Sequence, residues 1–164
     1  MSSQTLPLAR EVGQALLARG WRIGTAESCT GGLLAAAITD VAGSSGWFDE
    51  GLVTYANASK QRLLAVPADV LDSQGAVSQP VVEAMVKGVL ARGADVAVAT
   101  SGIAGPDGGS DEKPVGTVWF AWALAGRVFS ERKVFSGDRV AVRAQATEFA
   151  LSQLLQLLEA DSPT

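Results

Sequence analysis

At 164 residues the chain is long enough to bury a hydrophobic core, and we expect one domain over residues 1–164, with its core at about 8–158 and a polar tail at 160–164. Hydrophobic residues make up 48% of the chain and charged residues 18%, a composition that excludes intrinsic disorder. The net charge of −4 argues against a broad surface for nucleic acid or for an anionic membrane, so we expect neither partner.

The chain has one cysteine, Cys29, and no histidine. One cysteine excludes an intramolecular disulfide, and the sequence shows neither a signal-peptide core nor an apolar run of membrane-spanning length, so we expect a cytoplasmic protein. Without histidine, a Ser-His-Asp or Cys-His triad and a histidine-based metal site are excluded within this chain. A nucleophile here must be activated by lysine, tyrosine, a carboxylate, a metal-bound water or a neighbouring subunit.

Taken in chain order, the apolar pattern predicts a helix over residues 6–19, a strand over 21–26, a helix over about 31–42, a strand over 47–55 and a helix over 57–65. It then predicts a helix that begins near residue 78 and ends before Gly93, strands over 94–100, 115–124 and 127–135, and a last helix over about 139–158. The last two strands flank Ala125-Gly126, a two-residue hairpin signal. Helices and strands that alternate before a hairpin predict an α/β fold, a three-layer α/β/α single domain with a mixed sheet.

Binding sites in open sheets of this kind gather in the loops that follow the carboxyl ends of strands. The loops that qualify cover residues 27–32, 55–60, 100–110 and 136–143. The first joins a strand to a helix, where free backbone N–H groups and the helix dipole suit an anion or a nucleophile that generates one. The same loop is also explained by Thr30 as a helix N-cap, with Gly31 and Gly32 needed only for a tight turn.

A serine hydroxyl becomes a good nucleophile only when a base removes its proton, and Ser28 has no histidine available. Lys60 is the best-placed alternative if its loop lies against Ser28. Burial and a nearby cation, for which Arg139 or Arg143 would serve, must then bring the pKa of the lysine amine down toward neutrality. Tyr55 could relay a proton or orient the amine. The spacing alone is also explained by an exposed helix lysine and a half-buried strand aromatic.

Cys29 competes with Ser28 for the role of nucleophile, because a thiol at a helix N-terminus can have a lowered pKa. A lone cysteine beside a strand end is more often a small buried apolar residue. Neighbours in an extended segment point to opposite sides, so only one of the two can face a site. We favour Ser28.

The glycine-rich segment over 101–110 is typical of a cradle for an anion or a ribose, because glycines let backbone N–H groups approach a ligand closely. It lacks the Gly-Lys-Ser/Thr ending of a P-loop, and many such segments are simple turns. Asp107, Asp111 and Glu112 make a divalent cation conceivable, although their spacing is not that of a calcium loop.

Arg139 and Arg143 lie four residues apart at the start of the last predicted helix, so their side chains share one face. Such a pair could bind a phosphate through bidentate hydrogen bonds. It is also explained as a solvated pair on the protein surface.

Five ordered segments together resemble the CinA C-terminal-domain family, and most closely its stand-alone members, the nicotinamide-nucleotide amidohydrolases. They are AESCTGG at residues 26–32, GLVTYAN at 51–57 with Lys60, GAVS at 75–78, SGIAGPDGG at 101–109 and KPVGTV at 113–118. The similarity covers roughly residues 8–158, and no motif position departs from the family pattern.

The resemblance implies hydrolysis of the carboxamide of nicotinamide mononucleotide to nicotinic acid mononucleotide and ammonia, in pyridine-nucleotide recycling. It implies Ser28 as the nucleophile and Lys60 as its base, assisted by Tyr55 and Arg143, with no cofactor and no metal. The residues placed at the nucleotide substrate are Thr30, Gly31, Gly32, Asn57, Ser101, Gly102, Gly105, Gly108, Gly109 and Arg139. We also expect a homo-oligomer, a dimer.

Two other functions are compatible with the same residues. One is a nucleotide-binding or sensing module without turnover, with the glycine-rich segment and the arginines as its recognition surface. The other is metal-assisted phosphohydrolysis by Asp107, Asp111 and Glu112. Ammonia release, ligand-induced thermal stabilisation without turnover, and phosphate release distinguish the three.

Overall fold

The computed structural model describes residues 4–161, and its sheet contains five strands in the order β2-β1-β3-β4-β5. The strands are β1 (Ile23–Glu27), β2 (Phe48–Val53), β3 (Val96–Gly102), β4 (Thr117–Leu124) and β5 (Arg127–Val134). β1 pairs in parallel with β2 and β3, whereas β4 is antiparallel to both β3 and β5. The predicted mixed sheet is therefore confirmed, including the hairpin that joins β4 to β5 through Ala125-Gly126.

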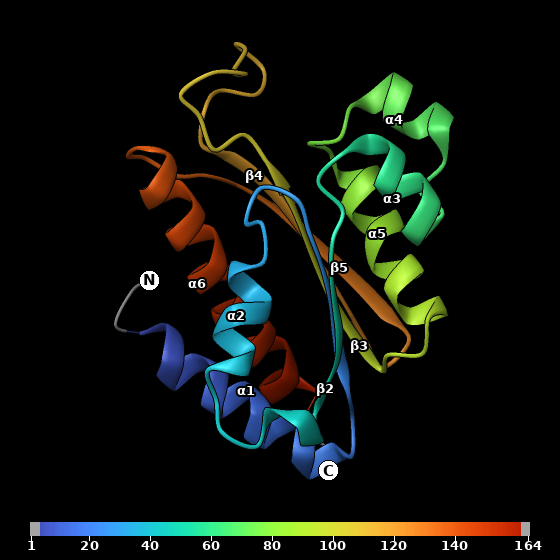
Figure 1. Ribbon diagram of the computed structural model, residues 1–164, viewed down its shortest axis with the longest axis vertical. Helices are drawn as coiled ribbons and strands as arrows, with labels where there is room; N and C mark the ends of the chain where they lie inside the picture. Colours follow the sequence, from blue (N-terminus) through green and yellow to red (C-terminus); the bar gives the residue numbers. More distant parts are fainter. Residues whose placement is uncertain (1–3, 162–164) are drawn as a thin grey trace.

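Helices cover both faces of the sheet (Figure 1). They are α1 (Thr5–Arg19), α2 (Leu33–Thr39), α3 (Asn57–Leu64), α4 (Ala68–Gln74), α5 (Gln79–Ala91) and α6 (Arg139–Ala160), with a short 3-10 turn, η1 (Ser44–Gly46). α1, α2 and α6 share one hydrophobic core with the sheet, and α3, α4 and α5 share the other. The three-layer α/β/α architecture is confirmed. No helix within residues 4–161 combines the length and apolar character needed to cross a membrane.

Side-chain size differs between the two faces of the central strands. On β4, Phe120 and Trp122 point into the core with α6, where the Phe149 ring packs edge-on at 4.9 Å from the ring of Phe120. Ala121 and Ala123, which alternate with them, point toward α5. Because alanines leave little bulk on that face, α5 lies directly on the sheet. α3 packs in turn against α5.

Two features of the helices differ from the prediction. α4 lies where no element was predicted, because its seven residues include Asp69 and Asp72 and bury only Leu71 fully, so they show no helical stripe. α2 begins at Leu33 rather than near residue 31, because Gly31 and Gly32 adopt φ values of 57° and 104°, in the left-handed region.

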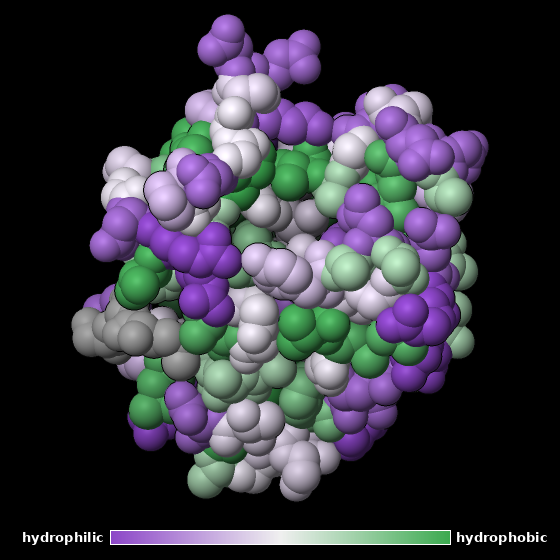
Figure 2. Space-filling model, turned by 45° about the horizontal axis from the view of Figure 1, so that its top comes forward, coloured by the Kyte–Doolittle hydropathy of each residue, from purple (hydrophilic) through white to green (hydrophobic). Residues whose placement is uncertain are grey.

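The carboxyl ends of β1, β2 and β3 lie at the same edge of the sheet. Pairing continues just beyond the strands, because the Ser28 N–H donates to the Thr100 carbonyl and the Thr54 N–H donates to the Glu27 carbonyl. The loops that follow these strands therefore meet there, as the topology predicts. In Figure 2 this end of the molecule is turned forward, and hydrophilic residues on the projecting loop after β3 and around α4 flank a more hydrophobic centre.

Candidate active site

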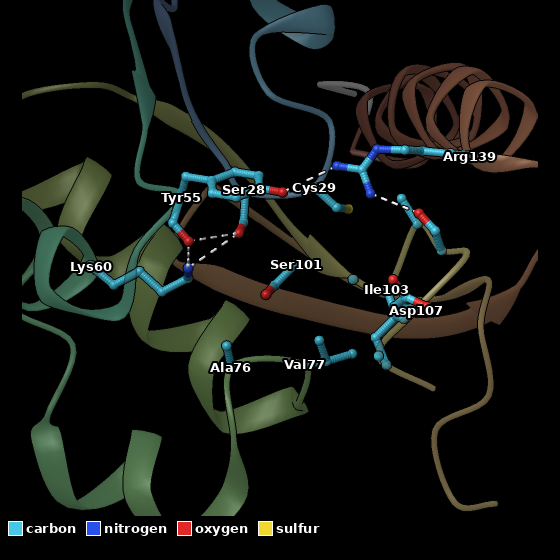
Figure 3. Close-up of a pocket in the computed structure, with 14 residues that line it drawn as sticks. Ser28, Cys29, Tyr55, Lys60, Ala76, Val77, Ser101, Ile103, Asp107 and Arg139 are labelled. Carbon is cyan, nitrogen blue, oxygen red and sulfur yellow. Dashed lines mark hydrogen bonds between the residues drawn. The ribbon is translucent and has the colours of Figure 1, made fainter. Parts of the chain in front are cut away.

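A cavity of about 310 Å³ opens at this edge of the sheet (Figure 3). Its lining comes from the loops after β1 and β2, Lys60 of α3, the loop before α5, the end of β3 with the loop that follows it, and the first residue of α6. The lining residues are Ser28, Cys29, Tyr55, Lys60, Ala76, Val77, Ser101, Gly102, Ile103, Ala104, Gly105, Asp107, Gly108 and Arg139. The size suits a small organic ligand rather than a macromolecule.

The amine of Lys60 reaches the hydroxyl of Ser28 across 32 positions of sequence. Lys60 Nζ lies 3.2 Å from Ser28 Oγ, 2.8 Å from the Thr54 carbonyl and 3.2 Å from the Tyr55 carbonyl. A neutral amine has two protons for the two carbonyls and a lone pair left for the serine hydroxyl. The arrangement is therefore that of a hydroxyl and the base that can deprotonate it.

Burial prepares Lys60 for this role. The side chain is fully buried, and this desolvation lowers the pKa of the Lys60 amine below its ordinary value of 10.5. Burial is one of the two predicted causes; the other, a nearby cation, does not contribute, because neither Arg139 nor Arg143 lowers this pKa. Burial alone disfavours the charged amine.

The thiol of Cys29 lines the same cavity but is poorly suited to attack. Burial is the main cause that raises the pKa of Cys29 to about 12, and Glu27 adds to it, so the residue is a neutral thiol near pH 7. The preference for Ser28 over Cys29 is thereby supported on chemical grounds.

The Tyr55 side chain lies elsewhere than a proton relay would require. Its phenol accepts a hydrogen bond from Arg139 Nη2 at 3.2 Å, and the side chain is 60% exposed. What Tyr55 offers to Lys60 and Ser28 is its backbone carbonyl. Figure 3 shows the bridge from Tyr55 to Arg139 along one side of the cavity.

Glu27, for which no role was predicted, fixes the turn that carries Ser28. Its carboxylate is fully buried and accepts hydrogen bonds from the Thr30 hydroxyl at 2.6 Å, the Leu34 N–H at 2.9 Å and the Ala35 N–H at 3.1 Å. The start of α2 is therefore already occupied by an anion of the chain itself. This corrects the expectation that the N-terminus of this helix is open to a ligand. The sequence did contain a signal for this role, because Glu27 is a carboxylate placed between a predicted strand and the start of a predicted helix.

Thr30 and Arg143 act from behind the turn. The Thr30 hydroxyl is buried between Glu27 and Thr100, so it faces the core rather than the cavity. Arg143 donates to the carbonyls of Cys29 and Thr30 at 3.0 and 3.3 Å. Neither side chain lines the cavity, and both hold the conformation of residues 28–32.

The other predicted substrate-binding residues fall into two groups, those that line the cavity and those that do not. Ser101, Gly102, Gly105, Gly108 and Arg139 line the cavity, whereas Gly31, Gly32, Asn57 and Gly109 do not. The hydroxyl-bearing Ser101 is 1% exposed and lies at the end of β3, between Ser28 and the glycine-rich loop in Figure 3.

Ala76 and Val77 also line the cavity, although their motif carried no predicted role. They reach it because α4, the unpredicted helix, brings the loop before α5 to this edge.

Within residues 4–161, no three His, Cys, Asp or Glu side chains are grouped so as to hold a metal ion, and this includes Asp107, Asp111 and Glu112.

Comparison with known proteins matches residues 5–158 to the model of the CinA C-terminal domain. The chain is 61% identical over 151 residues to nicotinamide-nucleotide amidohydrolase PncC of Enterobacter agglomerans, covering 91% of this chain and 92% of that protein. It is 58% identical over 156 residues to the protein of the same name from Escherichia coli K12, covering 94% of each.

Solved structures agree with the fold. The competence/damage inducible protein CihA of Agrobacterium tumefaciens superposes with a TM-score of 0.93 at 41% identity, covering 96% of this chain and 97% of that one. These findings agree with one another. The family model spans nearly all of the described chain, the relatives are of similar length, and a solved structure has the same fold. This chain belongs to the CinA C-terminal domain family.

Proposed function

We propose that this chain hydrolyses the carboxamide of nicotinamide mononucleotide to nicotinic acid mononucleotide and ammonia, with Ser28 as the nucleophile and Lys60 as the general base. The observation that carries the proposal is the 3.2 Å contact between the Lys60 amine and the Ser28 hydroxyl beside a ligand-sized cavity, in a chain without histidine. The names of the relatives from Enterobacter agglomerans and Escherichia coli support the choice of substrate.

In the first step, neutral Lys60 removes the proton of Ser28 while Ser28 Oγ forms a bond to the carboxamide carbon. The carbonyl double bond opens and leaves a negative charge on its oxygen. We assign the stabilisation of this oxyanion to backbone N–H groups of the turn that carries Ser28.

In the second step, the oxyanion collapses, the carbon–nitrogen bond breaks, and protonated Lys60 gives its proton to the departing nitrogen, which leaves as ammonia. A water molecule then attacks the ester on Ser28 with Lys60 again as its base. Cleavage of that ester returns the proton to Ser28 and releases the carboxylic acid. The carbonyls of Thr54 and Tyr55 hold the amine in place throughout, because both contact Lys60 Nζ.

The test is to incubate purified protein with nicotinamide mononucleotide and to follow ammonia together with nicotinic acid mononucleotide. We expect stoichiometric release of both products, no loss of rate with a chelator, and loss of turnover in Ser28→Ala. Thermal stabilisation by the nucleotide without ammonia would instead identify a binding module. Magnesium-dependent release of inorganic phosphate would identify a phosphohydrolase.

A further inference from the structure

Lys113 links two walls of the cavity that are far apart in the sequence. Its Nζ donates a hydrogen bond to the Gln74 carbonyl at 2.8 Å, across 39 positions. Lys113 belongs to the loop between β3 and β4, which also supplies the glycine-rich part of the lining. Gln74 ends α4 and precedes the loop that brings Ala76 and Val77 to the cavity. In Figure 1 the projecting loop after β3 and helix α4 lie on opposite sides of the upper end of the molecule.

The Lys113 end of this link is fixed by its own backbone. The Lys113 N–H donates to Ser110 Oγ at 3.1 Å, and the Lys113 carbonyl accepts from the Ser110 N–H at 2.9 Å. Arg132 on β5 donates to the Glu112 carbonyl at 2.9 Å and so ties the same turn to the sheet. Lys113 itself is only partly exposed. The link therefore starts from a turn that the sheet holds in place.

The segment at the other end of the link has less to hold it. α4 packs against α5, and of its seven residues it buries one, Leu71. Gly75 follows with φ 75° and ψ 163°, a conformation that glycine adopts and that strains other residues. The Ser78 hydroxyl donates to the Gly75 carbonyl at 2.8 Å, so this turn is closed on itself. The Lys113 amine lies against the turn, since a Cβ atom at Gly75 would be 3.4 Å from Lys113 Nζ.

The wall that this turn carries lies away from the reacting pair. Figure 3 places Ala76 and Val77 across the cavity from Ser28, with Ser101 between them. Ser28 and Lys60 belong to the loop after β1 and to α3, so a displaced wall leaves their 3.2 Å contact intact. An apolar wall without a reacting group contacts the substrate and the transition state equally. Such a contact changes KM and leaves kcat nearly unchanged.

We propose that Lys113 is a positioning residue that holds the wall formed by Ala76 and Val77 in place over the cavity. It acts through the backbone of Gln74 and does not line the cavity itself. The proposal rests on the proposed function and deepens it. It assigns a role to two motifs, GAVS at 75–78 and KPVGTV at 113–118, to which the chemistry of Ser28 and Lys60 gives none.

The test replaces Lys113 by methionine, which keeps much of the apolar length of the side chain but donates no hydrogen bond. Lys113→Met should raise KM for nicotinamide mononucleotide by about 3- to 10-fold, the factor that one intramolecular hydrogen bond is worth, and change kcat by less than about 2-fold. Lys113→Arg, which restores a cationic donor, should recover most of the loss. The pH profile of kcat should be the same in all three proteins. Lys87→Met, at an exposed lysine of α5 outside the cavity lining, is the matched control.

Hydrogen exchange measures the wall directly and needs no activity. In Lys113→Met the amides of residues 75–78 should exchange faster than in the wild type, while those of residues 28–34 should exchange at the same rate. Unchanged exchange at residues 75–78 would overturn the proposal, as would a fall in kcat with KM unchanged. If the wild type released no ammonia, the proposed function would fail by itself. Hydrogen exchange and calorimetric binding of nicotinamide mononucleotide to the wild type and to Lys113→Met would then still decide the role of Lys113.

Discussion

Lys60 Nζ and Ser28 Oγ lie 3.2 Å apart although Lys60 is fully buried and forms no ion pair within residues 4–161. A buried lysine without a carboxylate partner is unfavourable in its charged form. The fold retains this arrangement through the carbonyls of Thr54 and Tyr55, which accept hydrogen bonds from the amine. Functional sites are where such locally unfavourable groups concentrate.

Replacement of Lys60 by methionine should abolish turnover and leave the fold intact. Methionine keeps much of the length and apolar volume of the side chain but has no amine, so the Ser28 hydroxyl loses its base. We expect kcat to fall by about 10²- to 10⁴-fold, the range for general base catalysis. The measurement is ammonia release under saturating nucleotide, with Lys87→Met on the exposed side of α5 as the control. Retention of more than a tenth of the wild-type kcat in Lys60→Met would contradict the assignment.

The activity should rise with pH and then level off. Neutral Lys60 is the active form, and burial lowers the pKa of its amine below 10.5, so log kcat should increase with unit slope up to that lowered pKa and be constant above it. A profile that still climbs at pH 10.5 would show that the amine is not desolvated in solution.

Stability should follow the same titration. Between the lowered folded-state pKa of Lys60 and its unfolded value near 10.5, the unfolded chain binds the additional proton, so the free energy of unfolding increases with pH over that interval. Lys60→Met lacks this contribution. The difference in free energy of unfolding, wild type minus Lys60→Met, should therefore grow from neutral pH toward pH 10.5 in urea titrations. A difference independent of pH would mean that the Lys60 pKa is the same in both states.

Cys29→Ala should retain most of the activity. The pKa of Cys29 is about 12, so at pH 8 only about one thiol in 10⁴ is ionised and able to react. We expect kcat within a few-fold of the wild type, together with slow modification of the native protein by iodoacetamide at pH 8. Rapid alkylation that removes activity, combined with an inactive Cys29→Ala variant, would transfer the role of nucleophile from Ser28 to Cys29.

The sequence predicted the sheet, the layers and the position of the site because each depends on patterns along the chain. Buried strands such as β3 are apolar runs, and loops that follow parallel strands meet at one edge. What it did not predict depends on where a side chain ends up in three dimensions. Tyr55 presents its carbonyl to Lys60 and its phenol to Arg139, and spacing cannot separate these two roles.

Glu27 illustrates the same limit at the turn itself. Its three hydrogen-bond donors come from residues three, seven and eight positions further on, and they converge only when Gly31 and Gly32 adopt left-handed conformations. From the sequence, Thr30 was a candidate N-cap or a ligand contact. In the structure the carboxylate of Glu27 does the capping, and Thr30 is one of its donors.

Glu27→Ala should destabilise the fold strongly, because it leaves a buried hydroxyl and the N–H groups of Leu34 and Ala35 without their acceptor. Each unsatisfied buried donor costs about 1–3 kcal/mol, so we expect a loss of at least about 3 kcal/mol in the free energy of unfolding. Glu27→Gln, which keeps one acceptor oxygen, should lose less. Glu83→Ala on α5 is the control, since its carboxylate accepts hydrogen bonds from the exposed Gln79 and the partly buried Ser130. Equal stability of the wild type and Glu27→Ala would show that water replaces the carboxylate at the turn.

Gly88→Ala should impair both stability and catalysis, because this glycine lets α3 approach α5. A methyl group at Gly88 would collide with the backbone carbonyl of Leu64 and lie 2.8 Å from its Cα atom, and backbone cannot rotate aside as a side chain can. Leu64 is one helical turn after Lys60 on the buried side of α3, so any outward shift of α3 also withdraws the amine from Ser28.

We expect a loss of about 1–3 kcal/mol in the free energy of unfolding of Gly88→Ala and a fall in kcat that exceeds its effect on KM. Gly46→Ala is the matched control, because a methyl group there makes only an ordinary contact of 3.6 Å with Leu17 and lies far from the cavity lining. Denaturation and steady-state kinetics on the two variants separate the effects. A Gly88→Ala protein with unchanged kcat would show that Lys60 reaches Ser28 independently of how closely α3 packs on α5, and that the side chain rather than the helix sets the distance between amine and hydroxyl.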